Sequence, residues 1–297
     1  MGGRNYLLYE AFKKAYDDSE NYILNKLQIF NDFKNINFFT SHVYANCFPP
    51  DYKSMAKVGF FPVNEAGLEL EYSLFLAKGG MYKTAFMCLR NFLELSLICF
   101  YFLLQNDHKK PGVWSKGDED TPFKKEYLEA LFKNKDFQFF DKSFLLKDKI
   151  DEQCDFLSDF CHTKGQPCSH VKLTFSNFPR FIENSLLGFL TRVKEIINIV
   201  ITCFTCVNPL ILFPLPVTEK MGLNGPMTGF LEEGEVEILH KLLKPETLNQ
   251  LIEYYKSDDR VVSVRRWFNS FPDITEEEFE NQAKEFNKLI GGKEILD

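Results

Sequence analysis

Apolar residues recur at spacings of three and four along most of this chain, which is the period of an α-helix with one buried face. The pattern predicts a helix over residues 5–33 and a hairpin of two helices over residues 64–105, with Gly79 and Gly80 at the turn. The second arm, residues 81–105, is apolar nearly all round, which is typical of a helix in the centre of a bundle. We therefore predict an all-α fold, a helical bundle built around a central apolar hairpin.

The same period predicts further helices up to residue 207, including one over about residues 142–162, and the pattern then changes. Residues 208–231 contain four prolines and three glycines, a density of helix breakers that favours a linker. Residues 232–297 return to short amphipathic helices, the last of which begins with a capping box at Thr275–Glu278. The predicted organisation is a bundle over 1–207, a linker over 208–231 and a small helical C-terminal domain over 232–297.

The charged residues are distributed unevenly along the chain. The 297 residues are 45% hydrophobic and 26% charged, an ordinary globular composition that excludes disordered and fibrous classes. Residues 1–231 hold 26 acidic and 26 basic residues, whereas residues 232–297 hold 16 acidic and 9 basic ones, so the net charge of −7 lies entirely in the C-terminal part. We expect that part to bind nucleic acid poorly and to offer a docking surface for protein.

The sequence also bears on the compartment. No apolar segment of the signal-peptide kind follows the first residues, so we expect a cytoplasmic protein with eight reduced cysteines. Residues 95–104 are too short to span a bilayer, which needs about 20 residues. Residues 196–217 are long enough but include polar residues and three prolines, so we predict a buried helix and a connector there, without a membrane span.

Two polar constellations are candidate sites. Lys83, Arg90 and Glu94 share one face of the apolar second arm, and burying their charges is costly unless they are paired. Arg90 and Glu94 are therefore interpreted either as a cleft-facing arginine with an orienting carboxylate or as a structural ion pair.

The second constellation lies near the end of a later helix. Asp159 and His162 share a helical face, and a carboxylate beside an imidazole is the arrangement that general acid–base chemistry requires. His170 follows after a turn and is a further candidate if the chain folds back. The alternative is a polar helix end with a histidine favoured by the helix dipole.

Other chemistries have weaker signals. The cysteines and histidines between residues 154 and 170 lack a Cys-x₂-Cys pair, and their spacing fits no common zinc site, so we predict no metal. The chain contains no phosphate loop or dinucleotide fingerprint, so we predict no cofactor of that kind. Lys109, Lys110 and Trp114 form a small basic-aromatic spot that leaves RNA open as a partner.

Two segments carry a resemblance to a known family. The stretch Ala77–Ala85 continued by Leu89–Glu94, and the later stretch Phe156–Thr163, resemble HEPN-like helical proteins of bacteria, including abortive-infection and toxin-associated groups. The resemblance covers about residues 64–205. It implies an all-α bundle, often dimeric and often encoded in phage-defence or toxin–antitoxin loci. Active members cleave RNA without a metal through an arginine and a histidine four to six residues apart, a spacing that this chain lacks.

Two functions follow as hypotheses. The first is an intracellular interaction or regulatory protein of the HEPN-like kind, which binds a protein partner or a second copy of itself. The alternative is a metal-independent endoribonuclease, in which His162 is the general base and Arg90 stabilises the charge that develops on the phosphate, with Asp159 or Glu94 orienting them.

Overall fold

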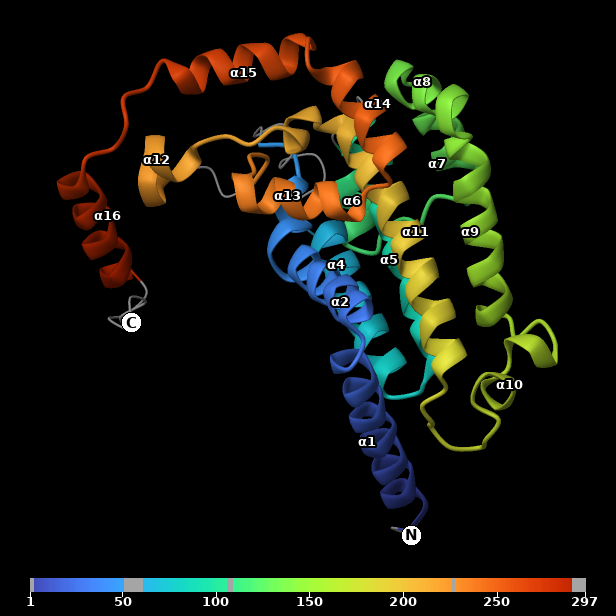
Figure 1. Cartoon of the computed structure of the whole chain (residues 1–297). Helices are drawn as coiled ribbons and strands as arrows, with labels where there is room; N and C mark the ends of the chain where they lie inside the picture. Colours follow the sequence, from blue (N-terminus) through green and yellow to red (C-terminus); the bar gives the residue numbers. More distant parts are fainter. Residues whose placement is uncertain (1–2, 51–60, 106–108, 226–227, 290–297) are drawn as a thin grey trace.

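The computed structural model describes residues 3–50, 61–105, 109–225 and 228–289, and this part of the chain is helical without any strand (Figure 1). The predicted all-α fold is confirmed. The α-helices are α1 (Gly3–Leu24), α2 (Leu27–Phe38), α4 (Phe61–Lys78), α5 (Tyr82–Leu104), α6 (Lys110–Ser115), α7 (Lys124–Leu131), α8 (Lys135–Phe144), α9 (Leu146–Cys161), α10 (His170–Thr174), α11 (Glu183–Val207), α12 (Val217–Met221), α13 (Glu233–Leu242), α14 (Pro245–Tyr255), α15 (Asp259–Asn269) and α16 (Glu276–Leu289). The shorter helical turns are η1 (Phe39–Val43), η2 (Ala45–Cys47), η3 (Gln166–Cys168), η4 (Pro209–Leu212) and η5 (Gly222–Asn224).

The predicted apolar hairpin is present and central. Helices α4 and α5 pack along each other, and the turn between them contains Gly80 with a φ of 73°. Helix α5 also packs against α7, α9 and α11, so neighbours surround it on several sides (Figure 1). Among the described helices, only α5 is long and apolar enough to cross a membrane, with a mean hydropathy of 1.6, and 61% of that stretch is buried inside the protein. Its contacts with these helices and with α10 explain its apolar composition.

Aromatic side chains fill much of the core around α5. The ring of Phe86 stacks on Phe160 of α9, with ring centroids 4.4 Å apart, and meets Phe189 of α11 edge to face. Near the other end of α5, Phe100 meets Phe204 of α11 edge to face at 4.7 Å. These are the stacked and edge-to-face geometries that aromatic pairs prefer. The phenylalanine content of the chain thus serves to join α5 to α9 and α11.

Two of the predicted helices are each divided in the structure. The helix expected over residues 5–33 breaks at Asn25 and Lys26, where Lys26 takes an extended conformation and α2 begins. The helix expected over residues 142–162 begins instead as α8, and Leu145 in the left-handed conformation separates it from α9. Neither break carries glycine or proline, so the sequence offers no breaker signal at these positions.

The segment interpreted as a linker is partly built into the core. Leu210, Ile211 and Leu212 of η4 are buried in the same apolar cluster as the bundle helices. Helix α13 packs against α2 and η1, and α14 packs against α11. The division into three domains stays a prediction, while the packing joins α13 and α14 directly to the bundle.

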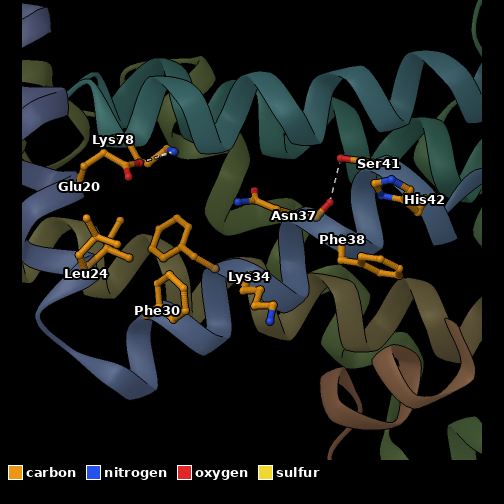
Figure 2. A pocket seen from close by; sticks show the side chains of 11 residues that line it. Glu20, Leu24, Phe30, Lys34, Asn37, Phe38, Ser41, His42 and Lys78 are labelled. Carbon is orange, nitrogen blue, oxygen red and sulfur yellow. Dashed lines mark hydrogen bonds and ion pairs between the residues drawn. The ribbon is translucent and has the colours of Figure 1, made fainter. Parts of the chain in front are cut away.

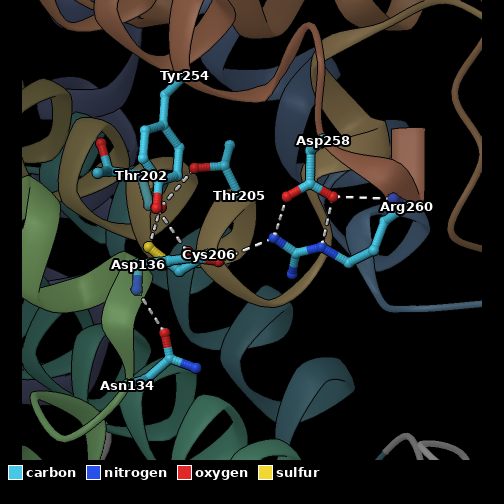
Figure 3. A network of polar contacts seen from close by, with 8 residues as sticks. All are labelled: Asn134, Asp136, Thr202, Thr205, Cys206, Tyr254, Asp258 and Arg260. Atoms are coloured by element: carbon cyan, nitrogen blue, oxygen red, sulfur yellow. Dashed lines mark hydrogen bonds and ion pairs between the residues drawn. The ribbon is translucent and has the colours of Figure 1, made fainter. Parts of the chain in front are cut away.

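A buried polar network reinforces this junction (Figure 3). Asp136 of α8 is only 2% exposed and accepts hydrogen bonds from the Arg260 guanidinium of α15 at 2.8 Å and from the Tyr254 hydroxyl of α14 at 2.9 Å. Arg260 also binds both carboxylate oxygens of Asp258, and this bonding holds the pKa of Asp258 below its usual range. A buried carboxylate is tolerated when it is paired and hydrogen-bonded in this way. The network therefore ties α14 and α15 to α8.

Helix α16 lies away from the bundle, beside α12 and η5 (Figure 1). Its predicted capping box is present, because Glu278 accepts a hydrogen bond from the Thr275 backbone N–H while the Thr275 hydroxyl oxygen accepts one from the Glu278 backbone N–H. A small second apolar cluster in this region contains Leu215, Val217 and Phe268.

Candidate functional site

Arg90 and Glu94 lie on the side of α5 that faces α7 and α9. The Arg90 Nη2 atom donates to Glu94 Oε1 at 3.0 Å, and the two side chains are 25% and 30% exposed. The Arg90 Nε atom is buried and has no hydrogen-bond partner. Partial burial alone would lower the pKa of the Arg90 guanidinium, but its contacts with Cys161 and Glu94 outweigh that effect and raise the pKa. The helical spacing correctly placed these two residues together.

Other helices bring further polar groups to this pair, and no spacing along α5 indicates them. The Cys161 thiol of α9 contacts the Arg90 guanidinium, and the buried Tyr127 hydroxyl of α7 lies within the electrostatic reach of both Arg90 and Glu94. The Tyr127 hydroxyl has no hydrogen-bond partner, and burial raises its pKa. Burial also raises the pKa of the nearby Cys154 thiol to about 12, so that thiol is protonated at neutral pH. We call Arg90, Glu94, Tyr127, Cys154 and Cys161 the α5–α9 polar cluster.

His162 follows this cluster in the sequence but is exposed at the end of α9. Asp159 lies one turn earlier, and its carboxylate pairs with Lys164 at 3.2 Å. Within the described residues, the His162 side chain makes no hydrogen bond or ion pair. The structure thus places Arg90 beside Cys161, the residue before His162. The His162 imidazole lacks the orienting carboxylate that we expected from Asp159.

His170 lies after the turn, at the beginning of α10, and is half-buried near the N-terminal end of α5. Burial lowers the pKa of its imidazole, a hydrogen bond with the Phe178 backbone opposes that shift, and the Lys83 ammonium lowers the pKa further. Lys83 also donates to the Thr163 hydroxyl at 2.6 Å. The chain therefore folds back so that His170 joins Lys83, two turns of α5 away from Arg90.

The described residues contain no arrangement of side chains suited to binding a metal ion. No group of three histidine, cysteine, aspartate or glutamate side chains in this part of the chain is placed to share a metal ion. All eight cysteines are free, and four of them (Cys47, Cys99, Cys203 and Cys206) are fully buried apolar groups whose thiol pKa burial raises.

A groove that the sequence does not indicate lies between α1 and α2 (Figure 2). Its volume is about 400 Å³, and its walls are mainly apolar, with Leu24, Phe30 and Phe38 partly exposed. The ion pair between Lys78 and Glu20 closes one end, and His42, which stacks on Phe38, lies at the other (Figure 2). The groove depends on the break between α1 and α2, which the uninterrupted helical period conceals.

A second feature of the surface is an aromatic face shared by α1 and α4. The Phe75 ring lies 5.2 Å from Phe12 and 5.6 Å from Tyr16 of α1, measured between ring centroids. Tyr72 and Leu68 continue the same side of α4 at helical spacing and are 54% and 41% exposed. We call Phe12, Tyr16, Leu68, Tyr72 and Phe75 the α1–α4 aromatic face.

The chain beyond this face adds to the exposed apolar surface. The N-terminal half of α1 extends away from the bundle (Figure 1), and it exposes 64% of Tyr6, 55% of Leu7 and 61% of Tyr9. Single exposed apolar residues are ordinary, whereas a contiguous group of them marks an interaction surface.

Comparisons with protein-family models, with curated proteins and with solved structures find no match to this chain.

Proposed function

We propose that this chain is a cytoplasmic helical interaction protein that self-associates through its α1–α4 aromatic face and regulates a partner protein. The observation that carries the proposal is that face, because it groups aromatic and aliphatic side chains that no other described helix covers. Tyrosine and phenylalanine dominate the energetics of protein interfaces. The resemblance to HEPN-like proteins supports a bacterial phage-defence or toxin–antitoxin-type system as the setting.

Sedimentation velocity of the purified chain tests the self-association. We expect a dimer for the unsubstituted protein and a monomer for Tyr72→Glu, because the new carboxylate would be buried without a partner. Replacing a central aromatic residue of an interface costs about 2 kcal/mol or more, which weakens a dimer about 30-fold. Tyr72 is half-exposed and makes no hydrogen bond in the described structure, so the substitution leaves the monomer folded.

Phe123→Glu is the matched control, because Phe123 is 81% exposed but precedes α7 and lies outside the α1–α4 aromatic face. This variant should remain a dimer. A monomeric unsubstituted protein at about 100 μM, well above the Kd of a specific dimer, contradicts the proposal. Equal weakening by Tyr72→Glu and Phe123→Glu contradicts it as well.

A metal-independent endoribonuclease is the second candidate, favoured by the contact between Arg90 and Cys161 beside His162. In this mechanism Arg90 stabilises the charge on the phosphate and His162 acts as general base.

Incubation of the protein with total RNA in EDTA tests this second candidate. We expect cleavage that Arg90→Lys and His162→Ala each reduce by about 100-fold or more, the scale of losing an acid–base or charge-stabilising group. His42→Ala, on the far α1–α2 groove, is the matched histidine control and should cleave normally. Absence of cleavage by the unsubstituted protein, or cleavage unchanged in His162→Ala, removes this candidate.

A further inference from the structure

A small polar cavity lies where α9, α11 and the start of α14 meet, away from both the α5–α9 polar cluster and the α1–α4 aromatic face. Its volume is about 120 Å³. A water molecule in the liquid takes about 30 Å³, so the cavity has room for about four waters or one small ion with water. The polar residues lining it are Lys149, Glu152, Gln153, Glu195, Asn198 and Lys244.

Two of the lining residues are lysines, Lys149 and Lys244. Lys149 comes from α9 and Lys244 immediately precedes α14, and both are exposed, so they stand on the solvent side of the cavity. In the described part of the chain, neither lysine forms an ion pair with a carboxylate. Burial lowers the pKa of the Lys149 ammonium, repulsion from Lys244 lowers it further, and Glu246 opposes the shift. The two positive charges therefore repel each other, and the Glu246 carboxylate offsets part of that repulsion.

One residue of the lining also carries a hydrogen-bond donor without a partner. The Asn198 Nδ2 atom of α11 is buried and has no hydrogen-bond partner. A buried amide donor without a partner destabilises a protein unless water or a ligand accepts its hydrogen bond. Asn198 lines the same cavity as the two lysines.

The two carboxylates of the lining are already held by another cation. The Arg192 Nη1 atom lies 3.3 Å from Glu152 Oε1 and 2.9 Å from Glu195 Oε2. Gln153, which is 4% exposed, donates a further hydrogen bond to Glu195 at 3.2 Å. These contacts direct the negative charge toward Arg192 and leave Lys149 and Lys244 as the unpaired charges of the cavity.

We propose that this cavity binds a small oxyanion of the phosphate class, held by the ammonium groups of Lys149 and Lys244 and by the Asn198 amide. A phosphate carries close to two negative charges at neutral pH, which matches two unpaired ammonium groups. Its oxygens accept charge-assisted hydrogen bonds from lysine and an ordinary one from the amide. Drug-sized ligands occupy sites of about 300–1,000 Å³, so the volume favours a free ion or a terminal phosphate group over a larger molecule.

Calorimetric titration of the full chain with inorganic phosphate, at constant ionic strength, tests the proposal. We expect saturable binding that the double substitution Lys149→Gln with Lys244→Gln weakens about tenfold, a modest factor because water screens both ammonium groups. Lys142→Gln is the matched control, since this lysine of α8 is exposed and lies outside the cavity lining, and its affinity should be unchanged. A parallel titration with a nucleoside monophosphate distinguishes a free ion from a phosphate ester. A cavity that takes phosphate esters should bind the monophosphate more tightly than inorganic phosphate, and a cavity that takes the free ion should not.

The Asn198 side-chain amide gives a second readout. In a ¹⁵N-labelled sample, its resonance should shift with phosphate but stay fixed when chloride is added to the same ionic strength. Absence of saturable phosphate binding overturns the proposal, and so does equal affinity of the double variant. Neither result depends on the oligomeric state, because the cavity does not use the α1–α4 aromatic face.

Discussion

Burial, together with a charge from a helix distant in the sequence, lowers the pKa of His170. Burial lowers the pKa of its imidazole first, and the Lys83 ammonium of α5 lowers it further. We expect ¹H–¹⁵N NMR titration to place the pKa of His170 below the ordinary histidine value of about 6.5. Lys83→Gln removes the positive charge and should raise that pKa toward the ordinary value while leaving the burial effect.

The same shift fixes the sign of a pH effect on stability. Because the folded-state pKa of His170 is lowered, its contribution to the free energy of unfolding is present above about pH 6.5 and is lost as the pH falls through the folded-state value. His170→Asn should reduce the loss of stability on acidification. An unchanged His170 titration in Lys83→Gln contradicts the assigned role of the ammonium.

At the residue scale, the sequence predicts contacts within a helix better than contacts between helices. Arg90 and Glu94 pair as their spacing of four indicates. The same spacing logic placed Asp159 near His162, but Lys164 after the helix end takes the carboxylate instead. Tyr127 comes from another helix, so no spacing along α5 could have revealed it. Spacing along the sequence does not show which of several possible partners a side chain binds.

At the element scale, the turn of the α4–α5 hairpin depends on Gly80. Its φ of +73° suits glycine, and a Cβ atom there would lie 2.5 Å from the Arg180 backbone nitrogen and 2.6 Å from its oxygen. A left-handed conformation costs an L-residue about 1–2 kcal/mol, and overpacking adds about 1–3 kcal/mol. Gly80→Ala should therefore lower the free energy of unfolding by about 2–5 kcal/mol in chemical denaturation.

Gly188 provides the matched comparison within another helix. It lies in α11 with nothing within 4 Å of the position of a Cβ atom, and its φ is not positive. Gly188→Ala should raise the free energy of unfolding by about 0.5–1 kcal/mol, because alanine favours the helix. Equal effects of the two substitutions would show that backbone conformation does not govern the hairpin turn.

The prediction of elements was wrong where a helix is broken without a glycine or a proline at the break. Periodicity detects apolar spacing, and this spacing continues across the break between α1 and α2, although Leu27 and Phe30 are 76% and 37% exposed in the structure. Leu145 adopts a left-handed conformation that leucine rarely takes, and its side chain is 61% exposed. Packing of α8 and α9 against separate partners holds this turn, and such contacts are invisible in a single sequence.

At the scale of the whole molecule, composition alone does not show how the segment 208–231 packs. Its prolines and glycines are typical of a linker, yet Ile211 is fully buried and Asn208 donates hydrogen bonds to the Cys47 and Gly229 carbonyls. Breaker residues exclude a long helix without excluding burial. The all-α class and the central hairpin were predictable because they rest on periodicity, whereas the attachment of the C-terminal helices rests on contacts such as Asp136 with Arg260.

This attachment predicts that the bundle and the C-terminal helices unfold together. The chain has two tryptophans, and they report on different regions. Trp114 of α6 packs against Phe102 of α5 at 5.3 Å, whereas Trp267 of α15 contacts Phe268 at 5.0 Å, both between ring centroids. Trp114→Phe and Trp267→Phe each leave one fluorescent probe. We expect the two variants to show the same denaturation midpoint, within the small effect of each substitution.

Leu251→Ala sharpens the comparison, because this α14 side chain is fully buried in the shared core. Removing it should cost about 2–5 kcal/mol through lost burial and the remaining cavity. If α14 belongs to one cooperative unit with the bundle, the substitution shifts the Trp114 and Trp267 transitions by the same amount. A shift confined to Trp267 would instead mean that the C-terminal helices unfold on their own, as the predicted separate domain over 232–297 requires.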